Sequence, residues 1–87
     1  MIELIWHGRA VKGLRKLPKQ DEVLVREKTN ALKSYPNLES LDVKKLTDQN
    51  GLYRLRVGNY RVLFEIKSGK TVIIEIQQIL RRTSSTY

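Results

Sequence analysis

The strongest constraint on the fold lies in the second half of the chain, where three apolar-rich segments alternate with a period of two residues. These segments are residues 52–57, 60–67 and 71–80. They are separated by two short sequences that favour turns, Gly58-Asn59 and Ser68-Gly69-Lys70. The pattern predicts two consecutive hairpins, and therefore an antiparallel three-stranded meander.

The first hairpin has a predictable register, because a two-residue turn places Val57 opposite Tyr60. Opposed residues share a face of the sheet. One face is then almost wholly apolar and is expected to face the core, while the other carries Arg54 and places Arg56 opposite Arg61. Like charges directly opposed destabilise a sheet by up to about 1 kcal/mol. Since folding gains nothing from this pair, the sequence favours an anion-binding face.

For the second hairpin we expect a three-residue loop, with Gly69 or a neighbour in the left-handed conformation. This register sets a row of core residues opposite one another: Val62, Phe64 and Ile66 against Ile76, Ile74 and Val72. It also places Gln77 opposite Arg61. The polar face is thus expected to bring four arginines together: Arg54, Arg56, Arg61 and Arg81. Three apolar side chains on that face suggest a covering partner: Leu63, Ile73 and Ile79.

The first half of the chain predicts a strand followed by two helices. Residues 2–7 alternate, with Ile2, Leu4 and Trp6 on one side, and form the strand. Apolar spacings of three and four predict helices over residues 9–17 and 20–34, which Pro18 and Pro36 end. The residues that define the apolar sides of these helices are Ala10, Leu14 and Leu17, then Leu24, Ala31, Leu32 and Tyr35.

Residues 37–50 are polar and irregular, and we expect a connecting loop with at most one short extended piece. A chain of 87 residues has room for one domain. The predicted fold class is therefore α+β, a single domain over residues 1–87. An N-terminal strand, a helical hairpin and the meander build one twisted sheet with the helices on one face.

The charge balance is strongly basic, with 17 Lys and Arg against 9 Asp and Glu, a net charge of +8. Residues 1–48 hold ten basic and seven acidic side chains, and residues 49–87 hold seven and two. This excess favours a polyanionic partner, which leaves nucleic acid, an acidic protein and an anionic membrane surface open. Apolar stretches are only a few residues long, far below the roughly 20 that cross a bilayer. We expect a soluble, cytoplasmic protein that does not bind membranes.

The residue types exclude several kinds of chemistry. The chain has no cysteine, and its carboxylates are scattered, so neither a metal site nor a cofactor is expected. The single histidine, His7, ends the first strand and is expected to be structural or exposed. Tyr53 and Tyr60 fall on the core side of the hairpin. What remains for catalysis is positioning and electrostatic stabilisation by the arginines.

The chain resembles the RelE/ParE superfamily of toxins from type II toxin–antitoxin modules. The resemblance rests on the Lys45-Leu46 pair, the block of residues 53–66 that includes Tyr-Arg-Leu-Arg-Val-Gly-Asn-Tyr-Arg-Val, and an Ile-Leu-Arg-Arg ending at residues 79–82. In RelE-like members it implies a metal-independent endoribonuclease that enters the ribosomal A site and cuts mRNA by attack of a ribose 2′-hydroxyl on the adjacent phosphate. ParE-like members share the fold but inhibit DNA gyrase, and this is the alternative reading. A basic nucleic-acid-binding module without toxicity also stays open.

The resemblance also implies roles for individual residues. Arg61, with Arg81 or Arg82, would bind the scissile phosphate, and Arg54 or Arg56 would stabilise the departing oxygen. Tyr87 would act as base or stack on a base of the message, and Lys45 and Arg82 would contact RNA. RelE-like enzymes commonly carry lysines where this chain has Arg54 and Arg56, and arginine cannot serve as a base. The implied partners are an antitoxin, mRNA and the ribosome.

Overall fold

The computed structural model describes residues 2–46 and 51–81, and these form two α-helices, one 3-10 helix and one five-stranded sheet. The strands are β1 (Ile2–Trp6), β2 (Asp42–Lys45), β3 (Leu52–Val57), β4 (Tyr60–Lys67) and β5 (Val72–Arg81). The helices are α1 (Gly8–Arg15), α2 (Lys19–Asn30) and the 3-10 helix η1 (Ala31–Ser34). The strand order is β1-β5-β4-β3-β2, with β1 parallel to β5 and the other neighbours antiparallel. The predicted α+β class is confirmed.

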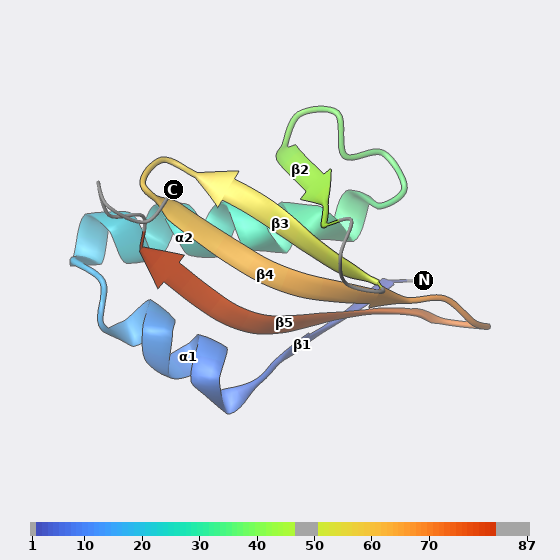
Figure 1. Cartoon of the computed structure of the whole chain (residues 1–87), viewed down its shortest axis with the longest axis horizontal. Helices are drawn as coiled ribbons and strands as arrows, with labels where there is room; N and C mark the ends of the chain where they lie inside the picture. The colour runs from blue at the N-terminus through green and yellow to red at the C-terminus, as the bar shows by residue number, and fades with distance from the viewer. Residues whose placement is uncertain (1, 47–50, 82–87) are drawn as a thin grey trace.

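Both α-helices lie on one side of the sheet (Figure 1). The covered face supplies buried residues such as Leu55 and Phe64, which form one core cluster with Ala10 and Leu14 of α1 and Val25 of α2. We call the other side of the sheet the open face, because no described helix packs on it. None of the helices in residues 2–46 and 51–81 is long and apolar enough to cross a membrane.

The prediction for the second helix is confirmed at Leu32, which is buried, and wrong at its first member. Leu24 is 44% exposed, and Val25 and Thr29 are buried instead. Three apolar residues occur in succession at positions 23–25, so their spacing alone does not select a face. Thr29 can enter the core because its hydroxyl donates a hydrogen bond to the Val25 carbonyl oxygen at 2.7 Å. Leu32, in the following 3-10 helix η1, is also buried and continues this row, seven residues after Val25.

The extended piece expected between residues 37 and 50 is strand β2. It pairs antiparallel with β3, so Asp42 lies opposite Arg56 and Lys44 lies opposite Arg54. β2 thereby extends the open face beyond β3 and brings one further cation next to the arginines. This strand is short and mostly exposed, which is how natural sheets commonly protect an edge.

The first hairpin has the predicted register from Leu52 opposite Glu65 to Val57 opposite Tyr60. Gly58 adopts a positive φ of 55°, at the first central position of the turn, where a type II′ turn favours glycine. Tyr53 stacks on Phe64 on the core face, with ring centroids 5.5 Å apart. Arg56 and Arg61 are directly opposed on the open face, as expected.

The predicted register of the second hairpin is wrong by two residues. Ile66 lies opposite Ile74 rather than Val72, and the loop is correspondingly longer. A bulge follows between Leu63 and Phe64, after which Leu63 lies opposite Gln78. The expected left-handed residue near Gly69 is also wrong, since positive φ within the described residues occurs at Gly51 and Gly58. Loop length and bulge depend on how the strands pack, which a turn sequence does not specify.

The bulge reverses the faces of the last residues of β5. Ile79 pairs with Val62 and is buried in the core, 9% exposed, whereas it was expected on the polar face. Leu80 lies opposite Arg61 on the open face, at the position where Gln77 was expected. Arg81 pairs with Tyr60 and so belongs to the helix side of the sheet. One extra residue in a strand shifts every later side chain to the other face.

Candidate functional site

The open face contains a cavity of about 460 Å³ lined by residues from β2, β3, β4, β5 and the residue after β2. We call it the open-face cavity, and its lining residues are Lys44, Leu46, Arg54, Arg56, Arg61, Leu63 and Leu80. The four cations therefore meet without a carboxylate among the lining residues. Three of the predicted site residues, Arg54, Arg56 and Arg61, lie together as expected.

The side chain of Arg54 is largely enclosed, with 12% of it accessible to solvent. It lies between Lys44 of β2 and Leu63 of β4 in the ladder. Its Nη2 atom is 3.5 Å from Oδ1 of Asp42, a carboxylate that is itself 57% exposed. A pair of this geometry contributes about 0–1 kcal/mol. Asp42 therefore orients Arg54 weakly and leaves it available to a stronger anion.

Arg56 and Arg61 face each other across the β3–β4 ladder, Arg56 exposed and Arg61 half-buried. Two guanidiniums at neighbouring positions can both donate to one phosphate, because each presents several N–H groups in a planar fork. A bound phosphate would also relieve the repulsion between them. This pair is therefore better suited to binding an anion than to stabilising the free protein.

The cavity also has an apolar part, formed by Leu46, Leu63 and Leu80. Leu63 was expected on this face, whereas Leu80 was missed because the bulge was not anticipated. Ile73, the third member of the expected patch, is half-buried and lies opposite Lys67, away from the cavity. An apolar surface beside guanidiniums suits a ligand that combines a phosphate with a flat ring, such as a nucleotide.

The predicted placement of Arg81 is wrong. The bulge in β5 turns Arg81 to the face opposite that of Arg61, and it lines a different cavity beside α1. Lys45 lies opposite Tyr53, on the helix side, so that Lys44 rather than Lys45 lines the open-face cavity, and the RNA contact expected of Lys45 stays a prediction. The signal for Lys44 was the pairing of β2 with β3, which places alternate residues of the Lys44-Lys45 pair on opposite faces.

Arg82 and Tyr87 fall outside the described residues, so their predicted roles stay predictions. His7 is exposed, as expected, and its Nε2 atom lies 3.5 Å from Oε1 of Glu75. It does not line the open-face cavity. Within residues 2–46 and 51–81 there is no group of three or more side chains that could hold a metal ion.

The side chains of the open-face cavity can bind an anion, and one of them can also transfer a proton. Arginine does not release its proton in proteins, so Lys44 is the lining side chain that can take part in proton transfer. The arginines can hold a phosphate and stabilise charge that develops on its oxygens. Fold and cavity together define a small basic α+β protein that is suited to a phosphate-bearing ligand.

Comparison with known proteins identifies the family. A family model described as the ParE toxin of the type II toxin–antitoxin system parDE matches residues 4–83. The toxin RelE3 of Methanocaldococcus jannaschii is 36% identical over 78 residues, which cover 85% of this chain and 83% of the relative. A protein of the same organism named RelE1 is 34% identical over 77 residues, 87% of this chain and 84% of that relative.

A solved structure agrees with these matches. A chain of the archaeal RelE–RelB complex from Pyrococcus horikoshii OT3 superimposes with a TM-score of 0.78 and 31% identity, over 97% of this chain and 98% of that chain. The chain described here therefore belongs to the ParE/RelE family of toxins of type II toxin–antitoxin systems.

Proposed function

We propose that this toxin is a ribosome-dependent endoribonuclease that cuts mRNA and so inhibits translation. The observation that carries this proposal is the open-face cavity, in which Lys44, Arg54, Arg56 and Arg61 surround an apolar surface. Its volume of about 460 Å³ falls within the roughly 300–1,000 Å³ typical of small-ligand sites. The relatives named RelE support the same class of activity. Acting on ribosomes would place the protein in the cytoplasm.

In the proposed reaction the 2′-oxygen of one ribose attacks the adjacent phosphorus and the 5′-oxygen of the next nucleotide departs. The 2′-hydroxyl loses a proton to a base, the 5′-oxygen gains one, and a 2′,3′-cyclic phosphate remains. Arg61 would hold the phosphate, and Arg54 and Arg56 would stabilise charge on the departing side. Lys44 would supply the proton to the 5′-oxygen.

Two roles rest on the resemblance alone. Tyr87 is the candidate base, or a ring that stacks on a base of the message. Arg82 becomes the better candidate for a second phosphate ligand, since Arg81 belongs to the helix side of the sheet.

The alternative function is inhibition of DNA gyrase, and the matching family model, described as the ParE toxin, favours it. A gyrase inhibitor would need the open-face arginines for binding at most, not for chemistry. The two functions therefore differ in whether the protein changes a covalent bond in RNA.

We further propose that the physiological partner is an antitoxin with an acidic segment that covers the open-face cavity. The relative from Pyrococcus horikoshii was solved as a RelE–RelB complex, which supports a protein partner of this kind. Carboxylates of the antitoxin would pair with Arg54 and Arg61, and its apolar side chains would cover Leu63 and Leu80.

The deciding experiment adds purified toxin to ribosomes translating a defined mRNA and maps new RNA ends by primer extension, with a parallel assay of gyrase supercoiling. We expect cuts that need the ribosome and that form about 10²–10³-fold more slowly in Arg61→Ala, with no effect on gyrase. Lys28→Ala, which removes an exposed cation of α2, serves as the matched control. Gyrase inhibition without new RNA ends would contradict the proposal.

A further inference from the structure

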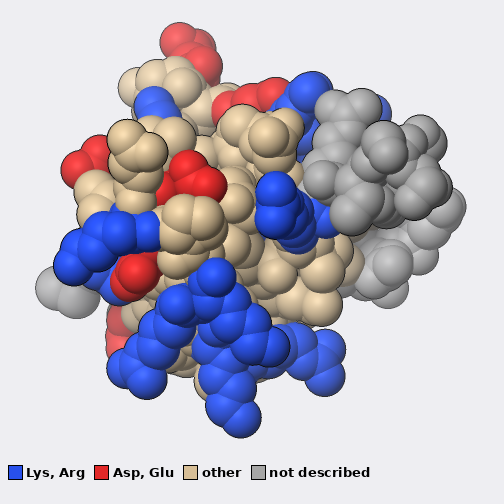
Figure 2. Space-filling view, turned by 90° about the vertical axis from the view of Figure 1, so that its left-hand side faces the viewer, with Lys and Arg blue, Asp and Glu red and all other residues tan. Residues whose placement is uncertain are grey.

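A second basic surface lies around α1, away from the open-face cavity. A cavity of about 690 Å³ is lined by α1 and the end of β5, and four cations line it: Arg9, Lys12, Lys16 and Arg81. Figure 2 shows Lys and Arg side chains gathered over the lower part of this side of the molecule, where α1 lies in Figure 1. We call this the α1 surface. None of its lining residues is acidic.

Helix stability explains the cations around α1 only in part. Lys12 lies in the last turn and Lys16 is the C-cap residue, where positive charges suit the helix dipole. Arg9 lies in the first turn, where a positive charge opposes that dipole. The three residues are spaced by three and four, so they share one side of the helix, where like charges repel and no acidic residue of α1 compensates. A row of like charges without acidic partners suits an anionic ligand.

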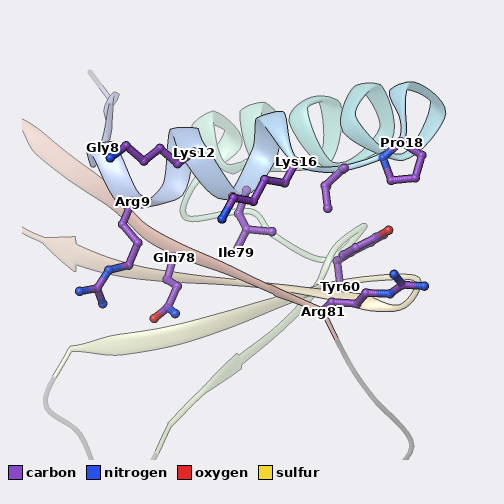
Figure 3. A pocket seen from close by; sticks show the side chains of 11 residues that line it. Gly8, Arg9, Lys12, Lys16, Pro18, Tyr60, Gln78, Ile79 and Arg81 are labelled. Atoms are coloured by element: carbon purple, nitrogen blue, oxygen red, sulfur yellow. The ribbon is translucent and has the colours of Figure 1, made fainter.

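Packing holds these cations close to β5. A Cβ atom at Gly13 would lie 3.4 Å from both the Cβ atom and the carbonyl oxygen of Ile79, so this part of α1 packs on the strand at ordinary van der Waals distance. In Figure 3, Lys16 extends from α1 towards Ile79, and Arg81 lies with Tyr60 at the far end of the cavity. The α1 surface therefore combines one helix and one strand end.

The hydroxyl of Tyr60 donates a hydrogen bond to Oδ2 of Asp21 at 2.8 Å, which fixes the ring at the end of the cavity. This hydrogen bond is the main cause that raises the pKa of Tyr60 above 10.0, with burial second, while Arg81 acts in the opposite direction. The phenol is thus neutral at physiological pH. Asp21 is engaged by this bond and does not line the cavity.

The spacing of the cations points to a polymer rather than to a single anion. Arg9 and Lys16 are separated by about 10 Å along the helix at 1.5 Å per residue. That distance is roughly the rise of three nucleotides along one strand of a duplex. A membrane surface fits less well, because the large exposed apolar side chains of the described residues, Ile5, Val23 and Leu24, lie outside α1.

We propose that the α1 surface binds the phosphate backbone of an RNA segment other than the strand held in the open-face cavity. The inference rests on the proposed function, since an enzyme that acts within the ribosome meets ribosomal RNA as well as the message. Lys12, Lys16 and Arg81 contact phosphates without reading bases, so the binding is independent of sequence and sensitive to salt.

The test uses a protein in which Arg56→Ala and Arg61→Ala disable the open-face cavity, and a fluorescent polyuridine of 20 nucleotides as the probe. Lys12→Glu with Lys16→Glu is compared with Lys28→Glu and Lys33→Glu, the same charge change at exposed positions of α2 and η1. We expect the first pair to weaken binding at least tenfold. Two lost contacts should also lower the slope of log Kd against log salt by about 1.4. The control pair should change affinity less than twofold.

Equal losses in both pairs would show that net charge alone matters and would overturn the proposal, as would unchanged binding in the first pair. Lys12→Gln with Lys16→Gln repeats the test with a smaller perturbation of the helix, and circular dichroism checks the fold. Vesicles with phosphatidylserine are a second probe, and loss of vesicle binding without loss of RNA binding would assign the surface to membranes instead. Cleavage in the protein with an intact open face is measured separately, so failure of the proposed nuclease would not be mistaken for failure here.

Discussion

Arg61 and Arg81 occupy neighbouring positions on adjacent strands, yet they belong to different basic surfaces of the molecule. Arg61 lies in the open-face cavity, where guanidiniums from two strands oppose each other beside leucines. Arg81 joins a row of cations on α1, which has no opposed arginine pair. The first arrangement can hold one phosphate in a defined orientation, and the second can attract a backbone. Arginine can thus orient a single phosphate on one face and attract a phosphate backbone on the other.

The largest expected effect separates these two surfaces. Arg61→Ala should lower the rate of mRNA cleavage by about 10²–10³, the usual effect of removing one preorganised donor. Arg81→Ala, measured at saturating ribosome concentration, should stay within about threefold because the residue lies on the other face. Arg82→Ala should follow Arg61→Ala if it is the second phosphate ligand. Equal losses at Arg61 and Arg81 would contradict the division into two surfaces.

Arg61→Lys sharpens the same comparison, because lysine keeps the charge but loses the planar fork. Partial recovery of cleavage would support bidentate binding of the phosphate. Thermal denaturation provides the control: removing Arg61 relieves the repulsion from Arg56, so the melting temperature should not fall.

Lys44 and Lys45 allow a matched test on adjacent residues. Lys44→Ala should reduce cleavage by about 10², within the range of general acid–base contributions, because Lys44 lines the open-face cavity. Lys44→Arg should not restore the rate, since arginine cannot transfer the proton. Lys45→Ala should leave single-turnover cleavage unchanged. Full activity of Lys44→Arg would mean that Lys44 contributes charge alone.

The bulge in β5 can be tested by stability. Ile79→Ala should lower the free energy of unfolding by about 2 kcal/mol, the lower end for truncation of a buried isoleucine, because Ile79 is in the core. Leu80→Ala should cost less than about 1 kcal/mol, since the half-buried Leu80 lies on the open face. Urea denaturation of both variants measures the difference. A larger loss at Leu80 would contradict the observed register.

The smallest expected effect concerns Tyr60. Its pKa is raised in the folded protein by the hydrogen bond to Asp21, so the folded state keeps the phenolic proton to higher pH than the unfolded chain. The stability that this contributes is present below pH 10.0 and is lost as the pH rises through the folded pKa. Tyr60→Phe should therefore be less sensitive to alkaline pH than the parent protein. Unfolding curves between neutral and strongly alkaline pH give the comparison.

Several features were predictable because they depend on neighbouring residues. The two-residue turn at Gly58 dictated the register of β3 and β4, and with it the opposition of Arg56 and Arg61. Helix α1 was predictable from the four-residue spacing of Ala10 and Leu14 and from Pro18, which cannot continue a helix. In each case the relevant interactions are local, so the order of residues suffices to specify them.

Other features needed the assembled molecule. The edge strand β2 is stabilised by β3, so its own polar sequence did not indicate that Lys44 would reach the open face. The helix side containing Val25 and Thr29 was selected by packing against the sheet, not by the run of three apolar residues. The spacing of apolar residues in the sequence does not specify either the partner of β2 or the buried side of α2.

By itself, the sequence determined the α+β class, the succession of first strand, two helices and meander along the chain, the first hairpin and the basic character of its polar face. The tertiary structure alone decided that Ile79 and Arg81 lie on the helix side and Leu80 on the open face. The physical reason is that β5 must match β4 on one edge and β1 on the other while burying Ile74, Ile76 and Ile79 under the helices. One bulged residue reconciles these demands, and it moves an arginine from one basic surface to the other.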